Sequence, residues 1–484
     1  MNLLHRVFLL SCVFNLVHLA IQPADLQAAD KPNILFVFAD DQCFDTIHAL
    51  GNKEVQTPNL DRLVAEGTTF THCYNMGGWN GAICVASRTM LNTGRYIWHA
   101  KAVSENLKAE VEADRFWSEQ MKSAGYKTYM TGKWHVKHNA DQTFNVADHI
   151  RGGMPKQTPD GYNRPVEGEP DKWSPFDKKF GGFWEGGTHW SEVVANDALS
   201  FLDDAKENDA PFFMYIAFNA PHDPRQAPQK YVDMYPQEEV NVPTSFMPLY
   251  PYREGMGAGK SLRDEKLAPF PRTEYSVRVN RQEYYAIITH MDHQIGRILE
   301  GLEKSGKRNN TWIFFTADHG LAVGHHGLLG KQNMYDHSVR VPFMVVGPGV
   351  GQGEKIKASI YLQDVMPTTL ELAQVEKPEH VDFHSILPLL SGTTEKSNYP
   401  AIYGGYINVQ RMVRKDGYKL IMYPKIGKAL LYNLKEDPKE LHDLFENPKT
   451  KSISAELFKT LLELQTENGD ELDLKAAFPN FAAG

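Results

Sequence analysis

Pro32-Asn-Ile-Leu-Phe-Val-Phe-Ala-Asp-Asp-Gln42 is the stretch of sequence on which the fold depends. Residues 32–39 form a continuous apolar run, which is typical of a central parallel strand buried on both faces. The run ends in Asp40 and Asp41. Ligand-binding groups collect beyond the carboxyl ends of strands in open α/β sheets, so both acids are candidate metal ligands. A solvated turn is the competing interpretation of the local sequence.

The same design recurs in Asn310-Thr-Trp-Ile-Phe-Phe-Thr-Ala-Asp-His-Gly320. Apolar residues lead into Asp318 and His319, and a glycine follows. With Asp40 and Asp41 these make four potential ligands, three of them carboxylates. Carboxylate oxygens favour a hard cation, Ca²⁺ or Mg²⁺, although a histidine nitrogen is unusual for either ion.

A different pattern stands in Gly81-Ala-Ile-Cys-Val-Ala-Ser-Arg-Thr-Met-Leu-Asn-Thr-Gly-Arg95. Residues 89–93 are predicted to be helical and to end at Gly94. If Cys84 opens this helix, Arg88 lies one turn further on the same face. A nucleophile, a cation and an anion-binding helix end then meet, which predicts a site for a tetrahedral oxyanion. A small buried cysteine without chemistry is the alternative.

Basic residues mark other segment ends. In Gly132-Lys-Trp-His135 the spacing predicts Lys133 and His135 on one face of an extended segment. His222 stands between prolines after the buried run 211–218, and Lys331 follows Gly330.

Six of these motifs, in order from Asp40 to Lys331, resemble those of the type I, formylglycine-dependent sulfatases of the alkaline phosphatase superfamily. The pattern Cys84-Val-Ala-Ser-Arg88 followed by Thr93-Gly-Arg95 is similar to the family's defining motif, with Ala86 where the commoner form has proline. The chain is closest in kind to secreted bacterial polysaccharide and iduronate-type sulfatases. The resemblance implies an α/β fold: a mixed, mainly parallel sheet flanked by helices, with a small C-terminal α+β subdomain.

The resemblance also implies a mechanism for hydrolysis of a sulfate ester by S–O cleavage. A maturation enzyme oxidises the cysteine to formylglycine (3-oxoalanine), and one oxygen of the hydrated aldehyde attacks sulfur. Carried over, Asp40, Asp41, Cys84, Asp318 and His319 hold Ca²⁺ or Mg²⁺. Arg88 and Lys133 stabilise the nucleophile and developing charge, His135 deprotonates the second hydroxyl, and His222 and Lys331 contact the sulfate and leaving oxygen, one as general acid.

Two alternatives stay open. A phosphomonoester or phosphonate hydrolase of the same superfamily would keep the fold and change the oxyanion. A sulfatase-like carbohydrate-binding protein, never matured at Cys84 because of Ala86, would keep the pocket without turnover. Trp79, Trp98, His99, Trp184 and His189 favour a sulfated carbohydrate substrate.

Length and composition bound the remaining predictions. At 484 residues two domains or subdomains are expected, here a catalytic domain over 30–373 and a C-terminal subdomain over 374–484. The formal charge of −9 argues against a nucleic-acid partner. Residues 1–29 are interpreted as a signal peptide, which predicts a secreted or periplasmic protein without membrane attachment after signal removal. Cys43 and Cys73 are expected either to pair or to remain buried thiols.

Overall fold

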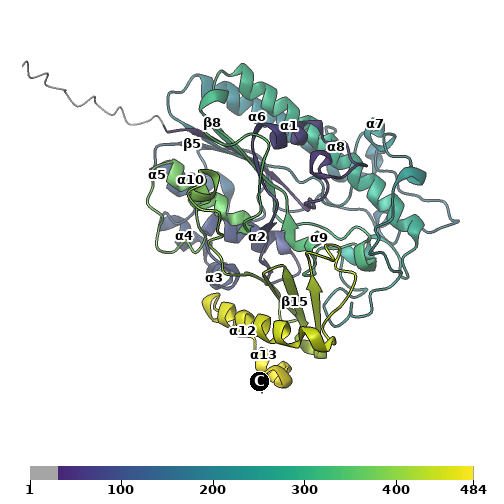
Figure 1. The fold of residues 1–484 in the computed structure, drawn as a ribbon. Helices are drawn as coiled ribbons and strands as arrows, with labels where there is room; N and C mark the ends of the chain where they lie inside the picture. Colours follow the sequence, from purple (N-terminus) through teal and green to yellow (C-terminus); the bar gives the residue numbers. More distant parts are fainter. Residues whose placement is uncertain (1–30, 483–484) are drawn as a thin grey trace, which may run out of the picture. The chain divides into compact units, whose positions relative to one another are not determined.

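The apolar run after Pro32 becomes strand β1 (Asn33–Ala39), at the centre of an eight-stranded sheet in the computed structural model (Figure 1). The structure describes residues 31–482, so the expected signal peptide lies outside the described residues. All seven residues of β1 are buried, because strands pair with it on both edges and helices cover both faces. The central-strand prediction is confirmed.

The sheet is mixed and mainly parallel. Its order is β11-β2-β10-β8-β1-β7-β5-β6, and only β10 runs antiparallel to its two neighbours. The strands beside β1 are β2 (Thr68–Phe70), β5 (Lys127–Lys133), β6 (Val146–Arg151), β7 (Phe212–Ala217), β8 (Thr311–Ala317), β10 (Phe343–Val346) and β11 (Glu354–Ile356). β6 was not anticipated, because its exposed edge position leaves no apolar run to recognise.

Helices flank this sheet, as the fold prediction requires. α1, α6 and α8 lie along one side, and α5 and α10 along the other (Figure 1). The helices are α1 (Pro58–Glu66), α2 (Ile83–Thr93), α3 (Ile97–Val103), α4 (Leu107–Glu112), α5 (Trp117–Ser123), α6 (Trp190–Lys206), α7 (Gln229–Val232), α8 (Glu274–Lys304), α9 (Asp336–Val339), α10 (Val365–Leu372), α11 (Leu387–Leu390), α12 (Lys451–Glu467), α13 (Leu474–Ala477) and α14 (Pro479–Ala482).

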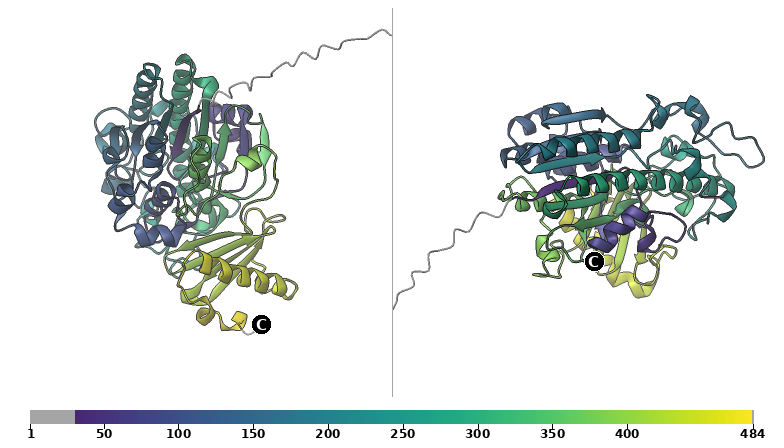
Figure 2. Two further views of the ribbon diagram at one scale, coloured as in Figure 1. Left: turned by 90° about the vertical axis from the view of Figure 1, so that its left-hand side faces the viewer. Right: turned by 90° about the horizontal axis from the view of Figure 1, so that it is seen from above.

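The C-terminal residues build a second, antiparallel sheet with α12 across one face (Figure 2). Its order is β16-β15-β14-β13-β4, and its strands are β13 (Ile402–Tyr406), β14 (Gln410–Lys415), β15 (Tyr418–Tyr423), β16 (Lys428–Asn433) and β4 (Gly77–Gly78). A small third sheet joins β3 (Cys73–Tyr74), β9 (Arg340–Val341) and β12 (Ile360–Tyr361).

Strand β4 comes from the N-terminal part of the chain but pairs in parallel with β13 of the C-terminal sheet. Residues from Pro32 onwards pack as one unit. The boundary between residues 373 and 374 therefore stays a prediction.

Two other expectations have outcomes. Cys43, Cys73 and Cys84 are all free and buried, so the alternative of buried thiols holds for Cys43 and Cys73. Every helix within residues 31–482 is too short or too polar to cross a membrane.

Candidate active site

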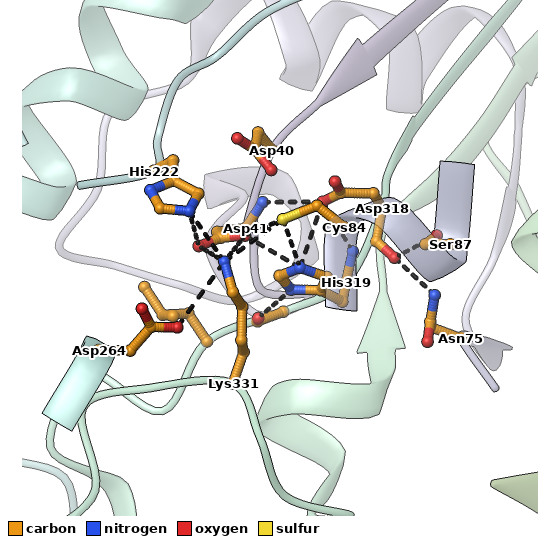
Figure 3. A network of polar contacts seen from close by, with 12 residues as sticks. Asp40, Asp41, Asn75, Cys84, Ser87, His222, Asp264, Asp318, His319 and Lys331 are labelled. Atoms are coloured by element: carbon orange, nitrogen blue, oxygen red, sulfur yellow. Dashed lines mark hydrogen bonds and ion pairs between the residues drawn. The ribbon is translucent and has the colours of Figure 1, made fainter. Parts of the chain in front are cut away.

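The acids predicted from two separate strands lie together at one edge of the sheet (Figure 3). β1 and β8 are in register, Ala39 beside Ala317, so Asp40 and Asp318 follow directly at neighbouring strand ends. The Asp41 N–H donates to Asp318 Oδ1 at 3.1 Å. Asp41 has a φ of 68°, a left-handed conformation that aspartate tolerates and that turns its side chain into the cluster. All three acids are fully buried.

Helix α2 brings the cysteine to these acids. Cys84 is in its first turn, and the helix ends at Gly94 in the left-handed conformation, as predicted. Ser87 Oγ donates to Asp318 O at 2.8 Å, and Arg88 Nε donates to Asp318 Oδ2 at 3.0 Å. One turn of α2 is thereby fixed to the end of β8.

Two basic side chains contact the Cys84 sulfur, and His222 contacts one of them. Lys331 Nζ lies 3.4 Å from Sγ and His319 Nε2 lies 3.3 Å from it. Lys331 Nζ also lies 2.9 Å from His222 Nε2 and 2.7 Å from Asp41 Oδ2 (Figure 3).

The charges of the cluster set its pKa values. Burial alone would raise the pKa of Cys84, but the positive charges of Lys133, Lys331 and His319 together lower it well below the usual value. Burial likewise opposes protonation of His222, yet the carboxylate of Asp41 raises the His222 pKa to about 10. Burial and the nearby Asp318 raise the pKa of Asp40 well above its usual value. The site therefore stabilises negative charge at position 84.

The predicted metal ligands fit a hard cation. Ligand atoms of Asp40, Asp41, Cys84, Asp318 and His319 lie within 4.8 Å of one another. Asp40 Oδ1 is buried and has no hydrogen-bond partner among the described residues, which is costly for a carboxylate oxygen unless a cation takes that place. Three carboxylates match the oxygen ligands that Ca²⁺ and Mg²⁺ require.

The geometric reason given for Lys133 and His135 is wrong, although both residues reach the site. β5 ends at Lys133, whose Nζ pairs with Asp40. His135 lies beyond the strand with a φ of 53°, so the segment is not extended there. Its ring nevertheless forms a side-chain hydrogen bond that lowers the Cys84 pKa.

The site opens into two joined cavities. One, of about 500 Å³, is lined by Cys84, His135, His222 and Lys331. The other, of about 1000 Å³, shares His135 and the residues 81–82 with it. A substrate much larger than a sulfate ion therefore has room beside the nucleophile.

Several site residues were missed from the sequence. Arg263 and Asp264 line the smaller cavity, and Gln332 Nε2 donates to Asp264 Oδ2 at 2.8 Å. Asp223 Oδ1 lies 3.0 Å from His222 Nδ1 and holds that ring in place. Asp223 stands within the motif around His222, whereas Arg263 and Asp264 come from a long irregular segment that carries no strand-end signal.

Two of the residues that favoured a carbohydrate substrate, Trp184 and His189, are not at the surface. Trp184 is buried at 7 % exposure, and His189 is fully buried, with its ring 5.1 Å from that of Phe183. These two side chains are part of the core and cannot stack on a sugar.

The sequence of this chain matches two family models. The sulfatase family model matches residues 32–375, and the model for the C-terminal part of N-sulphoglucosamine sulphohydrolase matches residues 324–467. The chain belongs to the sulfatase family, and it is therefore a sulfuric ester hydrolase. The fold class and enzyme class predicted from the motifs are confirmed.

One sequence relative and two solved structures show how similar this chain is to known proteins. An arylsulfatase of Clostridium perfringens is 29% identical over 482 residues, which cover 90% of this chain and 94% of that one. A solved structure in complex with its substrate D-glucosamine-2-N,6-O-disulfate has a TM-score of 0.69 at 22% identity, covering 91% of this chain and 99% of the other. A phosphonate monoester hydrolase of Silicibacter pomeroyi has a TM-score of 0.72 at 19% identity, with 91% and 96% covered. At such identities the two structures show the fold alone.

Proposed function

We propose that this protein removes sulfate from a sulfated carbohydrate, with formylglycine at position 84 as the nucleophile and one divalent cation, Ca²⁺ or alternatively Mg²⁺. The observation that supports the proposal most directly is that Cys84, three carboxylates and several basic side chains lie together in one buried cluster. Basic side chains placed around the reacting atom stabilise the negative charge that develops during attack.

In this proposal Asp40, Asp41, Asp318 and His319, with the side chain at position 84, hold the cation. The bound cation would polarise the sulfate oxygens. Arg88 anchors Asp318 and also donates from Nη1 to Lys133 O at 2.5 Å, so it orients both the acids and the strand end that carries Lys133. Formylglycine supplies a hydrate hydroxyl that attacks sulfur, and its formation requires a maturation enzyme.

His222 and Lys331 are assigned to the leaving-group side. His222 Nδ1 is fixed by Asp223 at 3.0 Å, so its Nε2 faces Lys331 and the cavity. We assign the proton given to the leaving oxygen to His222 Nε2, and contact with the sulfate to Lys331 Nζ. His135, which lines the same cavity, remains the group that takes a proton from the second hydroxyl.

A sulfated carbohydrate is the proposed substrate because the joined cavities leave space for a sugar and more. The structural relative that binds a glucosamine disulfate supports this class. We further propose export of the protein, in line with the signal peptide interpreted at residues 1–29.

Turnover of 4-nitrophenyl sulfate and 4-nitrophenyl phosphate, measured side by side, tests the reaction class. The protein is produced with and without a formylglycine-generating enzyme, and the mass of the peptide around position 84 is determined. We expect sulfate turnover that increases with the fraction of formylglycine. Faster turnover of the phosphate would favour the phosphohydrolase alternative. Full sulfate turnover with an unmodified Cys84 thiol would refute the nucleophile.

Cys84→Ser separates the two roles of the formylglycine hydrate, which are attack on sulfur and expulsion of sulfate. A serine hydroxyl can attack once, but it has no second hydroxyl to expel sulfate, so the variant should stall as a sulfate ester when the maturation enzyme accepts only cysteine. Intact-mass analysis after incubation with substrate detects that adduct. Repeated turnover by Cys84→Ser contradicts the proposed breakdown step.

A further inference from the structure

A separate cavity of about 620 Å³ lies where α3, the loop before α2 and the turn between β13 and β14 meet. It shares no lining residue with the two cavities at Cys84. Its wall includes Trp79, Trp98, Lys101, Asn408 and Arg411.

The two tryptophans of the chain that are only half-buried both line this cavity. Of the eight tryptophans, six are buried at 0–9 % exposure, and the two half-buried ones are Trp79 and Trp98. The Trp98 indole N–H donates to Tyr403 Oη at 2.8 Å, and the Arg411 guanidinium lies 4.7 Å from its ring centroid. Trp79 has no hydrogen bond, ring stacking or cation–π partner within residues 31–482. Trp79 packs partly against the hydrophobic core of the C-terminal sheet, and the rest of its surface lines the cavity, where a ligand can contact it.

The charges at this cavity cancel, unlike those at the active site. Arg411 forms a forked pair with Asp470, with Nε and Nη2 at 2.6 and 2.7 Å from its oxygens. Lys101 and Glu471 also line this wall, so its two positive and two negative side chains carry no net charge. Aromatic faces beside uncharged and mutually neutralised polar groups suit a neutral ligand that has hydroxyl groups and an apolar face.

The backbone around the cavity is held in an unfavourable conformation. Ile407, at the start of the turn, has a φ of 37°, which β-branched residues avoid. Its N–H donates to Gly78 O at 2.9 Å. Because Trp79 follows Gly78 and Asn408 follows Ile407, this single hydrogen bond fixes the indole next to the exposed amide.

We propose that this cavity is a second carbohydrate-binding subsite. It takes an uncharged pyranose ring, stacked on Trp79 and hydrogen-bonded through its hydroxyls to Asn408 and Lys101, from the same glycan chain that carries the sulfate. Trp79 is five residues from Cys84, so their Cα atoms are at most about 18 Å apart. An oligosaccharide of a few sugar units is long enough to cover this separation.

The statement that the same glycan carries the sulfate rests on the proposed function. The test therefore measures binding of unsulfated oligosaccharides, which does not depend on turnover. Cellohexaose, maltohexaose and agarohexaose are titrated into the full chain by calorimetry and tryptophan fluorescence. We expect one-to-one binding of at least one hexasaccharide, weakened at least tenfold by Trp79→Leu and by Asn408→Ala. Phe176→Leu, which alters a 38 % exposed aromatic residue away from the cavity, is the matched control and should bind as the unaltered chain does.

Asn408→Ala and Ile407→Gly keep the test decisive if Trp79→Leu does not fold. The Asn408 side chain is exposed, so its removal leaves the core intact. Glycine suits the left-handed φ at position 407 but removes a side chain that lines the cavity, so Ile407→Gly should fold and should bind more weakly. Absence of binding by all three hexasaccharides, or binding by Asn408→Ala equal to that of the unaltered chain, overturns the subsite. Loss of sulfatase turnover with hexasaccharide binding intact counts against the proposed function only.

Discussion

Arg88 and Arg164 each lie between two carboxylates, and their hydrogen bonds are completed differently. Arg164 Nη1 donates to Glu283 Oε2 at 2.8 Å, and its Nε and Nη2 donate to Asp171 Oδ2 at 2.9 and 2.6 Å. Arg88 donates to Asp318, but its Nη2 stops 3.9 Å from Asp40 Oδ1. Among residues 31–482 neither of these two atoms has a hydrogen-bond partner.

The difference separates a structural ion pair from a site for a ligand. The Arg164–Glu283 ion pair attaches an irregular loop to α8. Arg164 also pairs with Asp171, so the guanidinium and both carboxylates have partners inside the protein. At Arg88 and Asp40, one atom of each charged group has no hydrogen-bond partner among the described residues. This lowers stability unless a ligand binds to those atoms. We therefore expect changes at the first pair to affect folding and changes at the second to affect chemistry.

Cys84→Ala should have the largest effect. Removing the nucleophile should lower kcat on the order of 10⁶-fold, the scale for loss of a catalytic nucleophile, with little change in unfolding temperature. Sulfate ester turnover and thermal unfolding are measured together. Cys73→Ala, at a fully buried thiol in β3, is the control and should keep its turnover per folded molecule.

Arg164→Met should affect stability most. It leaves Glu283 buried without its partner, which costs about 3–5 kcal/mol of unfolding free energy. Denaturant titration measures this loss, and turnover per folded molecule should not change. A normal unfolding midpoint with reduced turnover would reverse the roles assigned to the two arginines.

Arg88→Lys should mainly slow the reaction. An ammonium cannot reproduce the forked donors that bind Asp318 and Lys133 O, so kcat should fall about 10²–10³-fold, equivalent to about 2.7–4 kcal/mol. Steady-state kinetics check this value. Arg164→Lys is the matched control, and an equal kinetic loss there would remove the distinction between the two regions.

Chelation should have a smaller effect on stability than Arg164→Met. With the cation at a hundred times its Kd, binding stabilises the folded state by about 2.7 kcal/mol, so exhaustive chelation should lower the unfolding temperature and abolish turnover. Added Ca²⁺ should restore both. Because the Arg164 side chain bonds to Asp171 and Glu283 and to none of the proposed ligands, Arg164→Met should lose the same increment on chelation. If chelation changes neither the unfolding temperature nor the turnover, the ligand assignment is wrong.

The sequence predicted those parts of the site that follow from strand periodicity. Asp40 and Asp318 were placed together because each follows an apolar run that only a buried parallel strand accommodates. Cys84 and Arg88 were placed on one helical face because helical spacing is fixed. The fold class follows from the same runs.

Other parts depend on packing that no local pattern records. Arg263 and Asp264 reach the cavity from an irregular segment, and β4 consists of two glycines, which have no strand preference. His135 reaches Cys84 through a left-handed backbone conformation, whereas spacing alone predicted an extended one. From the sequence, Trp184 and His189 favour a carbohydrate substrate, but both are buried, because the rest of the fold decides whether an insertion is buried.

Strand β4 limits how such a chain can be recombined. A Cβ at Gly77 would lie 2.1 Å from Gly405 O, so the close approach of β4 and β13 requires glycine at position 77. The nucleophile helix begins five residues after β4. A chimera that takes its C-terminal sheet from a relative must therefore preserve the pairing of Gly77 with Gly405, or the nucleophile shifts. New substrate ranges should accordingly arise through the turns of this sheet, such as residues 407–409, while its edge strand stays constant.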